Sequence, residues 1–128
     1  MEPSKELDEL AKLVIGAAIE VHRHLGPGYL ESVYEEALGI ELEECAISFQ
    51  CHHPVSVAYK GKPVGESKLD FLLADKLVVE LKAVEILLPV HKAQVISYLK
   101  ATRLQLGLLI NFNVPVLRDG IQRIIHSL

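Results

Sequence analysis

Three charged side chains in an otherwise apolar stretch are the residues of this sequence best suited to chemistry. Residues 70–82 read as two apolar strands joined by a tight turn at Ala74-Asp75-Lys76. Charged residues are poor choices for strands this apolar, so Asp70, Glu80 and Lys82 need a reason to be there. If the turn uses these three residues, Asp70 lies directly opposite Glu80, with Cβ atoms about 4.5–5.5 Å apart.

The alternation of side chains along a strand adds a third group to this predicted carboxylate pair. Lys82 follows Glu80 by two positions, so both side chains lie on the same face of the strand. Two carboxylates and an ammonium group at one place describe a divalent-metal site with a basic group beside it. The prediction depends on the register, because a loop one residue shorter or longer would send Asp70 to the opposite face.

A cross-strand salt bridge between Lys82 and Asp70 on a solvated face is the alternative interpretation. The neighbouring residues are apolar at odd and even positions, which is typical of a central strand covered on both faces. In such a place two carboxylates repel each other unless a cation or a proton neutralises them. The residues alone leave both the metal site and the salt bridge open.

The rest of the chain must provide the elements that position these residues. The hydrophobic pattern predicts two helices, three strands, a helix, a strand and a short final strand, over residues 4–25, 29–45, 55–59, 64–73, 77–83, 90–102, 104–112 and 120–126. The third helix permits a right-handed crossover to a parallel strand. We therefore expect an α/β fold with a mixed central sheet of four to five strands flanked by helices. A single domain would cover residues 1–128.

Polar residues of two predicted helices could border the same cleft. His91, Gln94 and Tyr98 share one helical face, and the amide and hydroxyl groups suit the binding of a phosphate chain. A half-exposed amphipathic helix explains the pattern equally well, and for His91 alone it is the better explanation. Glu31 is favoured in the first turn of its helix by the helix dipole, and its direction makes it a candidate third carboxylate.

Composition restricts the partners and the location that we expect. A formal net charge of −4 argues against nonspecific adhesion to nucleic acid, although bound divalent cations would change the field around a carboxylate cluster. Lys60, Lys62 and Lys68 form a modest basic patch that a solvated turn explains equally well. No apolar run reaches the ~20 residues that span a bilayer, and the polar N-terminus is unlike a secretory signal. We expect a cytoplasmic protein that does not bind membranes.

The two cysteines, Cys45 and Cys51, form no paired CxxC motif. We interpret both as reduced thiols, with a disulfide left open. Cys51-His52-His53 could bind zinc together with Cys45, but the spacing matches no common zinc pattern. A loop or strand start with a buried thiol at Cys51 is the preferred interpretation.

Taken together, these motifs resemble a known group of enzymes. Asp70, then Glu80-Leu81-Lys82, then Gln94 and Tyr98 resemble the PD-(D/E)XK nuclease superfamily, in its branch with a QxxxY helix. Gly28-Tyr-Leu-Glu31-Ser-Val-Tyr34 is similar to the motif that names the GxxExxY proteins. The resemblance extends over nearly the whole chain.

The resemblance implies a restriction-endonuclease-like core and a metal-dependent nuclease. Asp70 and Glu80 would bind Mg²⁺ or Mn²⁺ together with the carbonyl group of Leu81. Lys82 would assist the attacking water; we favour an electrostatic role over proton abstraction, because nearby carboxylates stabilise the ammonium form. Glu31 would lie near the metal ion.

The same resemblance implies hydrolysis of phosphodiester bonds, for which we expect DNA as the substrate. Gln94 and Tyr98, with His91 on the same face, would contact the nucleic acid. The sequence departs from the usual motif in having Leu69 in place of the proline before Asp70. The main alternative is a non-catalytic nucleic-acid-binding or assembly module that retains the fold, acting as a homo-oligomer or with a partner protein. A phosphoesterase acting on RNA or a nucleotide is a third interpretation.

Overall fold

The computed structural model describes residues 3–127 of the chain. Its elements follow one another as α1 (Lys5–Leu25), α2 (Glu31–Glu44), β1 (Phe49–Tyr59), β2 (Lys62–Leu73), β3 (Leu77–Lys82), α3 (Pro89–Thr102), β4 (Leu106–Asn111), the short 3₁₀ helix η1 (Leu117–Gly120) and β5 (Ile121–Ile125). The predicted order of two helices, three strands, a helix and two strands is therefore confirmed. None of the helices in the described part of the chain is long and apolar enough to cross a membrane.

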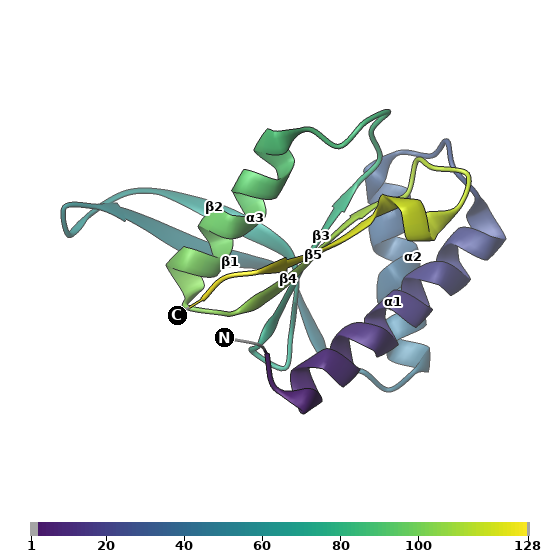
Figure 1. The fold of residues 1–128 in the computed structure, drawn as a ribbon, viewed down its shortest axis with the longest axis horizontal. Coiled ribbons are helices and arrows are strands. Elements are labelled where there is room, and N and C mark those ends of the chain that lie inside the picture. Colours follow the sequence, from purple (N-terminus) through teal and green to yellow (C-terminus); the bar gives the residue numbers. More distant parts are fainter. Residues whose placement is uncertain (1–2, 128) are drawn as a thin grey trace.

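The strands form one mixed sheet in the order β1-β2-β3-β4-β5. All neighbouring strands are antiparallel except β3 and β4, which are parallel and are joined by the crossover helix α3. Helices α1 and α2 cover one face of the sheet and α3 covers the other (Figure 1). The structure thus has the predicted α/β class, with five strands between two helical layers.

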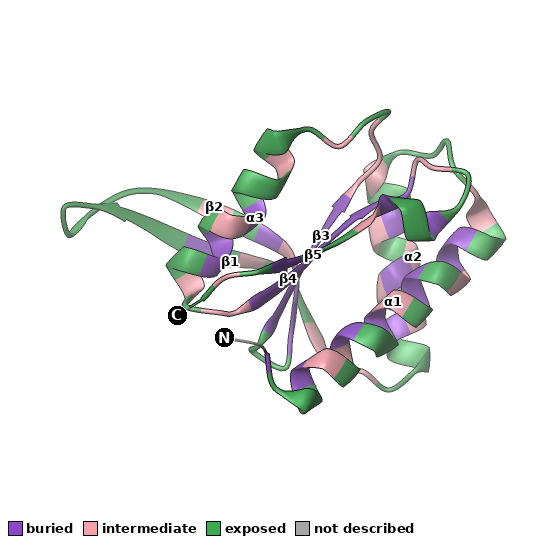
Figure 2. Ribbon diagram, in the orientation of Figure 1, coloured by how far each residue is buried: buried purple, intermediate pink, exposed green. Residues whose placement is uncertain are grey.

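Two apolar cores hold the layers together, one on each face of the sheet. The larger core joins α1 and α2 to the sheet, and the smaller one joins α3 to it. Strands β3 and β4 lie between the two cores, so residues 77–81 and the whole of β4 are buried (Figure 2). This confirms that the strand bearing Glu80 is a central strand covered on both faces.

The β1–β2 hairpin is longer than its sequence pattern predicts. Strand β1 begins at Phe49, six residues before the predicted start at Val55, and its outer part extends beyond the sheet with only β2 as a partner. The early part of β1 was missed because the consecutive polar residues His52 and His53 interrupt the alternation of apolar and polar residues. Figure 1 shows the hairpin projecting from the body of the molecule.

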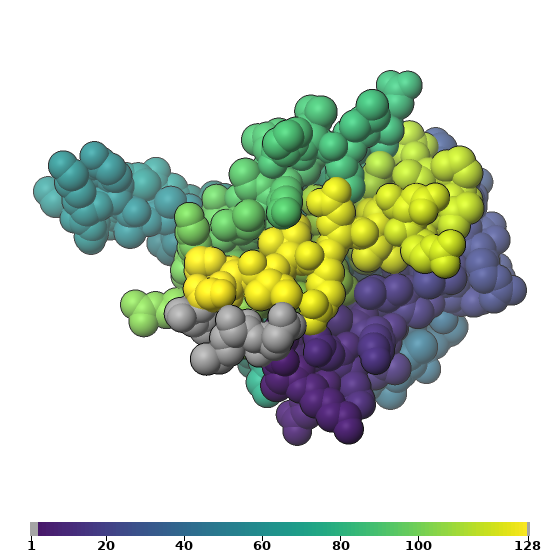
Figure 3. Space-filling view, in the orientation of Figure 1, coloured from purple at the N-terminus to yellow at the C-terminus, as the bar shows by residue number. Residues whose placement is uncertain are grey.

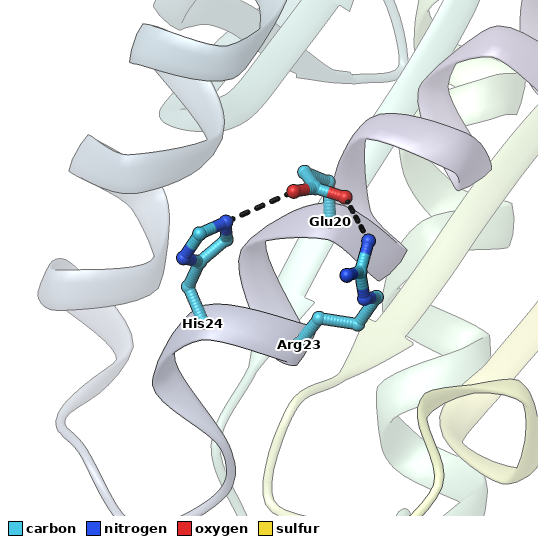
Figure 4. Close-up of polar contacts among 3 residues, drawn as sticks. All are labelled: Glu20, Arg23 and His24. Atoms are coloured by element: carbon cyan, nitrogen blue, oxygen red, sulfur yellow. Dashed lines mark hydrogen bonds and ion pairs between the residues drawn. The ribbon is translucent and has the colours of Figure 1, made fainter.

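Helix α1 has a defined beginning and end. The Ser4 hydroxyl accepts a hydrogen bond from the Leu7 amide at 3.2 Å, as an N-cap residue does. Near the other end, Glu20 accepts hydrogen bonds from Arg23 at 2.7 Å and pairs with His24 at 2.9 Å (Figure 4). Arg23 and His24 are well exposed to solvent and Glu20 is partly exposed, so the pairs stabilise the helix end only slightly.

Candidate metal centre

The β2–β3 hairpin has the register on which the predicted carboxylate pair depends. Its three paired positions are Phe71↔Val79, Leu72↔Val78 and Leu73↔Leu77. The turn is closed by a hydrogen bond from the Lys76 amide to the Leu73 carbonyl at 2.9 Å. Ala74 and Asp75 adopt positive φ angles of 52° and 55° to make this turn. One further step along the same register places Asp70 opposite Glu80, as the sequence predicts.

Side chains replace the backbone ladder beyond the last paired residues of this hairpin. The Asp70 amide donates to Glu80 Oε1 at 2.9 Å, and the Leu81 amide donates to Asp70 Oδ2 at 2.8 Å. Each carboxylate is thus held by a backbone amide of the opposite strand. The two reciprocal bonds fix Asp70 and Glu80, called here the carboxylate pair, side by side where β2 and β3 separate.

The environment of the carboxylate pair opposes its full ionisation. Glu80 is only 3% exposed. Burial, with the negative charge of Asp70, raises the pKa of Glu80 to about 8, while the Lys82 charge and the Asp70 amide act in the opposite direction. A hydrogen bond between the two carboxyl groups, which forms only when one of them holds a proton, raises the pKa of Glu80 further. A cation placed between them would take over the role of this proton.

Glu31 approaches the carboxylate pair from α2, of which it is the first residue. Its pKa is raised by burial and by the Asp70 charge, and the Lys82 charge lowers it. Within residues 3–127, no group of three or more His, Cys, Asp or Glu side chains is arranged so that it could hold a metal ion. Mg²⁺ commonly uses only one or two protein carboxylates and completes its shell with water and substrate phosphates.

Lys82 ends β3 on the side of the sheet where these carboxylates lie. Its positive charge lowers the pKa of Glu31 and of Glu80. The Lys82 carbonyl accepts a hydrogen bond from the Phe112 amide at 2.9 Å, which ties the end of β3 to β4. The structure therefore brings together the three predicted charged groups and Glu31.

Helix α3 brings Tyr98 to the same place. It covers the face of the sheet on which Glu80 and Lys82 lie, because Val78, on the same side of β3, packs against α3. Burial and the charge of Glu80 raise the pKa of Tyr98, and hydrogen bonds with Ser67 and Gln94 lower it. The phenol thus links Gln94 on its own helix to Ser67 on β2, close to the carboxylate pair. Sequence analysis predicted Gln94 and Tyr98 but missed Ser67, for which the sequence carries no distinctive signal.

His91 caps the beginning of α3 in this structure. Its Nδ1 atom accepts a hydrogen bond from the Leu88 amide at 2.9 Å, at the beginning of α3. The Leu88 amide is one of the donors that a helix N-terminus leaves without a partner, so the imidazole acts as a cap. No interaction of His91 with the carboxylate pair is seen, and capping explains its presence.

Asn111 is a further residue of the site region that sequence analysis did not single out. It is 2% exposed and lies beside Lys82 in the parallel pairing of β3 and β4. Its Oδ1 atom accepts from the Val84 amide at 3.0 Å, and its Nδ2 group donates to the Val84 carbonyl at 2.8 Å. The chain that follows Lys82 is thereby fixed. A lone amide in an otherwise apolar strand was the available signal.

The prediction of a buried thiol at Cys51 is wrong. Cys45 and Cys51 are both free and exposed, because Cys51 lies on β1 at the edge of the sheet. Partial burial and the charges of Glu35 and Glu36 raise the pKa of the Cys51 thiol. The adjacent His52 pairs with Glu35. Among the residues that the structure describes, no cluster of thiols and imidazoles at this edge could hold a metal ion.

A five-stranded mixed sheet flanked by helices is consistent with a restriction-endonuclease-like fold. The family model of the PD-(D/E)XK nuclease superfamily matches residues 8–124, and the chain belongs to this superfamily. No curated protein and no solved structure matched the chain in the other two comparisons. The superfamily suggests a nuclease-type function on nucleic acid, and its members generally use divalent metal ions.

Proposed function

We propose that this chain is a divalent-metal-dependent nuclease that hydrolyses phosphodiester bonds in DNA. The observation that carries the proposal is the carboxylate pair, which reciprocal backbone hydrogen bonds hold where β2 and β3 separate. A buried acid whose pKa is strongly shifted by desolvation and by a specific charged neighbour is typical of functional sites. Membership of the nuclease superfamily supports the same reaction class.

The donor atoms of the site fit Mg²⁺ or Mn²⁺. Asp70 and Glu80 would hold the ion, together with the carbonyl group of Leu81. All of these donors are oxygen atoms, which hard divalent cations prefer. Each carboxylate uses one oxygen for a backbone amide, and the second oxygen of each would become a donor for the ion once the proton between the two carboxyl groups is lost.

The chain's own side chains would divide the remaining work. When bound, the ion supplies Lewis-acid polarisation of the phosphate and lowers the pKa of water. Lys82 would stabilise the negative charge that develops on the phosphate. Glu31 would act as the third carboxylate near the ion, and its raised pKa suits a group that exchanges a proton with water. Gln94 and Tyr98 would contact the phosphate chain.

The distribution of charge favours approach of the nucleic acid from the α3 side. Helix α3 contains two lysines and no acidic residue, whereas α2 contains six glutamates and no lysine or arginine. A polyanion is therefore repelled by the α2 face and attracted to the α3 face.

Within the superfamily, the segment around Glu31 supports the GxxExxY group, and Gln94 with Tyr98 supports the QxxxY branch.

The test is a cleavage assay on labelled single-stranded DNA, duplex DNA and RNA with Mg²⁺, Mn²⁺ or EDTA. We expect metal-dependent cleavage that Asp70→Asn and Glu80→Gln each reduce by about 100-fold or more, because each removes a charged ligand. Glu36→Gln on the exposed surface of α2 is the matched control and should keep full activity. Activity that survives both site substitutions would exclude the proposal.

A non-catalytic nucleic-acid-binding or assembly module is the second candidate. The glutamate-rich face of α2, which repels a polyanion, favours its assembly form with a protein partner. Such a module would need no ion between the two carboxylates. Calorimetric titration with Mg²⁺ and Mn²⁺ separates the candidates, because the nuclease requires binding that Asp70→Asn abolishes. Folded protein that binds neither ion at millimolar concentration would support the module.

A further inference from the structure

The outer part of the β1–β2 hairpin forms a two-stranded ribbon without a covering layer. Strand β3 pairs only with residues 71–73 of β2, so the ribbon beyond this point has two open edges. Residues 56–66 are all exposed. In Figures 1 and 3 the ribbon, drawn in teal, projects well beyond the rest of the molecule. We call residues 54–68 the arm.

The arm exposes side chains that usually lie against a partner. Tyr59 is 63% exposed and Val64 is 61% exposed, on a hairpin that has no apolar core of its own. A two-stranded hairpin in water is marginally stable by itself, so contact with another molecule would stabilise it. Lys60 lies over the Tyr59 ring, with its Nζ atom 5.4 Å from the ring centroid. An aromatic face next to a cation thus marks the end of the arm.

The charge of the arm indicates the kind of partner. It carries Lys60, Lys62 and Lys68 but only one acidic residue, Glu66. The whole chain has a formal net charge of −4, so the arm is a basic extension of an acidic molecule. A second copy of this chain would bring its own excess of negative charge, whereas a polyanion complements lysines without specific geometry.

The arm is continuous with the candidate metal centre. Residues opposite each other on paired strands share a face, as do alternate residues of one strand. Val55, paired with Ser67, packs in the apolar core of α3, and Ser67 hydrogen-bonds to Tyr98. Val57 and Tyr59 follow Val55 at alternate positions of β1 and therefore lie on the same face, and Tyr59 pairs with Lys62. The extra residue at the register shift after Val57 lies on β2, so the alternation along β1 is not interrupted. One surface therefore runs from Tyr98 to the end of the arm.

We propose that the arm binds single-stranded nucleic acid and leads it to the carboxylate pair. Tyr59 stacks on an unpaired base, and Lys60 and Lys62 contact the phosphates on either side of it. A single strand is favoured over a duplex because its bases offer free faces for aromatic stacking, which duplex bases do not. This inference rests on the proposed function and specifies the substrate of the same site.

The first experiment measures binding without cleavage. Fluorescence anisotropy in EDTA compares a labelled single strand with the corresponding duplex, for the full chain and its variants. For Lys60→Ala/Lys62→Ala we expect the affinity for the single strand to fall about tenfold or more, and the salt slope to decrease by about 1.4. Lys5→Ala/Lys12→Ala removes the same charge from α1 and should leave the slope unchanged.

Substitution of Tyr59 separates stacking from charge. Tyr59→Ala should weaken single-strand binding by about tenfold while changing duplex binding little, and Tyr59→Phe should restore it, because stacking needs only the ring. Equal losses for both DNA forms, or no rescue by phenylalanine, would overturn the assignment to single strands. Circular dichroism of each variant confirms that these exposed substitutions leave the fold intact.

The second experiment distinguishes failure of this inference from failure of the proposed function. If the protein cleaves DNA, Lys60→Ala/Lys62→Ala should raise KM about tenfold with kcat nearly unchanged, because the arm contacts a part of the substrate remote from the reaction.

Unchanged binding and KM in the arm variants would overturn the role of the arm while cleavage stands. Lost binding in a protein that never cleaves would support the arm and exclude the nuclease. A wild-type dimer that becomes monomeric in the arm variants, with unchanged DNA affinity, would overturn the inference and make the arm a contact between copies.

Discussion

Glu80 is the residue whose ionisation should be visible in the stability of the protein. Its pKa is raised from 4.5 to about 8 in the folded state. A raised pKa means that the protonated form favours folding, so this contribution is fully present below pH 4.5 and is lost as pH rises through 8. We expect the free energy of unfolding in EDTA to fall by on the order of 3–5 kcal/mol between pH 5 and pH 9 through this group.

Urea unfolding at several pH values tests this expectation. Glu80→Gln has no ionisable group at this position, so its free energy of unfolding should lose most of the alkaline decrease seen for the wild type. Glu36→Gln, on the exposed side of α2, should keep it. Parallel pH profiles for wild type and Glu80→Gln would contradict the expectation.

Addition of Mn²⁺ at pH 8 should stabilise the wild type more than Glu80→Gln, because the ion takes the place of the shared proton.

The three strand residues that sequence analysis found share one property. Asp70, Glu80 and Lys82 are charged residues in apolar strands, so their environment follows from the local pattern and a single assumption about turn length. Ser67 and Asn111 are uncharged and act through partners distant in the chain: Tyr98 for the first and Val84 for the second. Local patterns do not specify such partners, and only the assembled fold brings them together.

Helix α3 packs closely on β4 at Gly107. A Cβ atom added to Gly107 would lie 2.7 Å from Val95 Cγ1, and a buried valine has no flexible end that could move away. We expect Gly107→Ala to destabilise the protein by about 1–3 kcal/mol, since overpacking shifts the backbone. The displaced helix carries Tyr98 and Gln94, so nuclease activity should also decrease.

Thermal denaturation together with the cleavage assay checks this prediction. Gly65 on the arm is the matched control, because a Cβ atom there would meet nothing within 4 Å. Gly65→Ala should leave the unfolding free energy unchanged within about 0.5 kcal/mol. If both alanine variants behave like the wild type, the spacing of α3 from the sheet does not depend on Gly107.

Sequence patterns located the elements well where capping residues or strong periodicity mark them. The start of α1 was placed within one residue because apolar residues recur there at helical spacing, and that of α3 because Pro89 opens it. Strand β1 was shortened because its first half is an edge strand with polar residues on both sides. Edge strands lack the burial that produces a period of two, so their ends depend on a partner strand that the local pattern does not show.

Across the whole molecule, charge is divided between the two faces of the sheet. The α2 side is acidic, while α3 and the arm are basic. We expect Lys92→Glu/Lys100→Glu on α3 to weaken DNA binding by about tenfold or more at low salt, because each reversal places a negative charge beside the polyanion. Lys5→Glu/Lys12→Glu on α1 changes the net charge equally and should have a much smaller effect.

Anisotropy titrations at two salt concentrations measure this difference. If both double reversals weaken binding equally, net charge rather than the α3 face governs association. The division of charge was not predicted, although every charged residue is visible in the sequence. The net charge of −4 is an average over both faces. Which helix covers which face follows from the crossover between β3 and β4 and from the packing of α1 and α2 together on the opposite side.

The reciprocal hydrogen bonds give Asp70 and Glu80 a structural role in the hairpin in addition to the proposed chemical one. Either carboxylate, once lost, would leave a backbone amide of the neighbouring strand without its acceptor, at a cost of about 1–3 kcal/mol. Natural selection for a closed hairpin is thus sufficient to preserve both acids, or their amides, in a lineage that no longer cuts DNA.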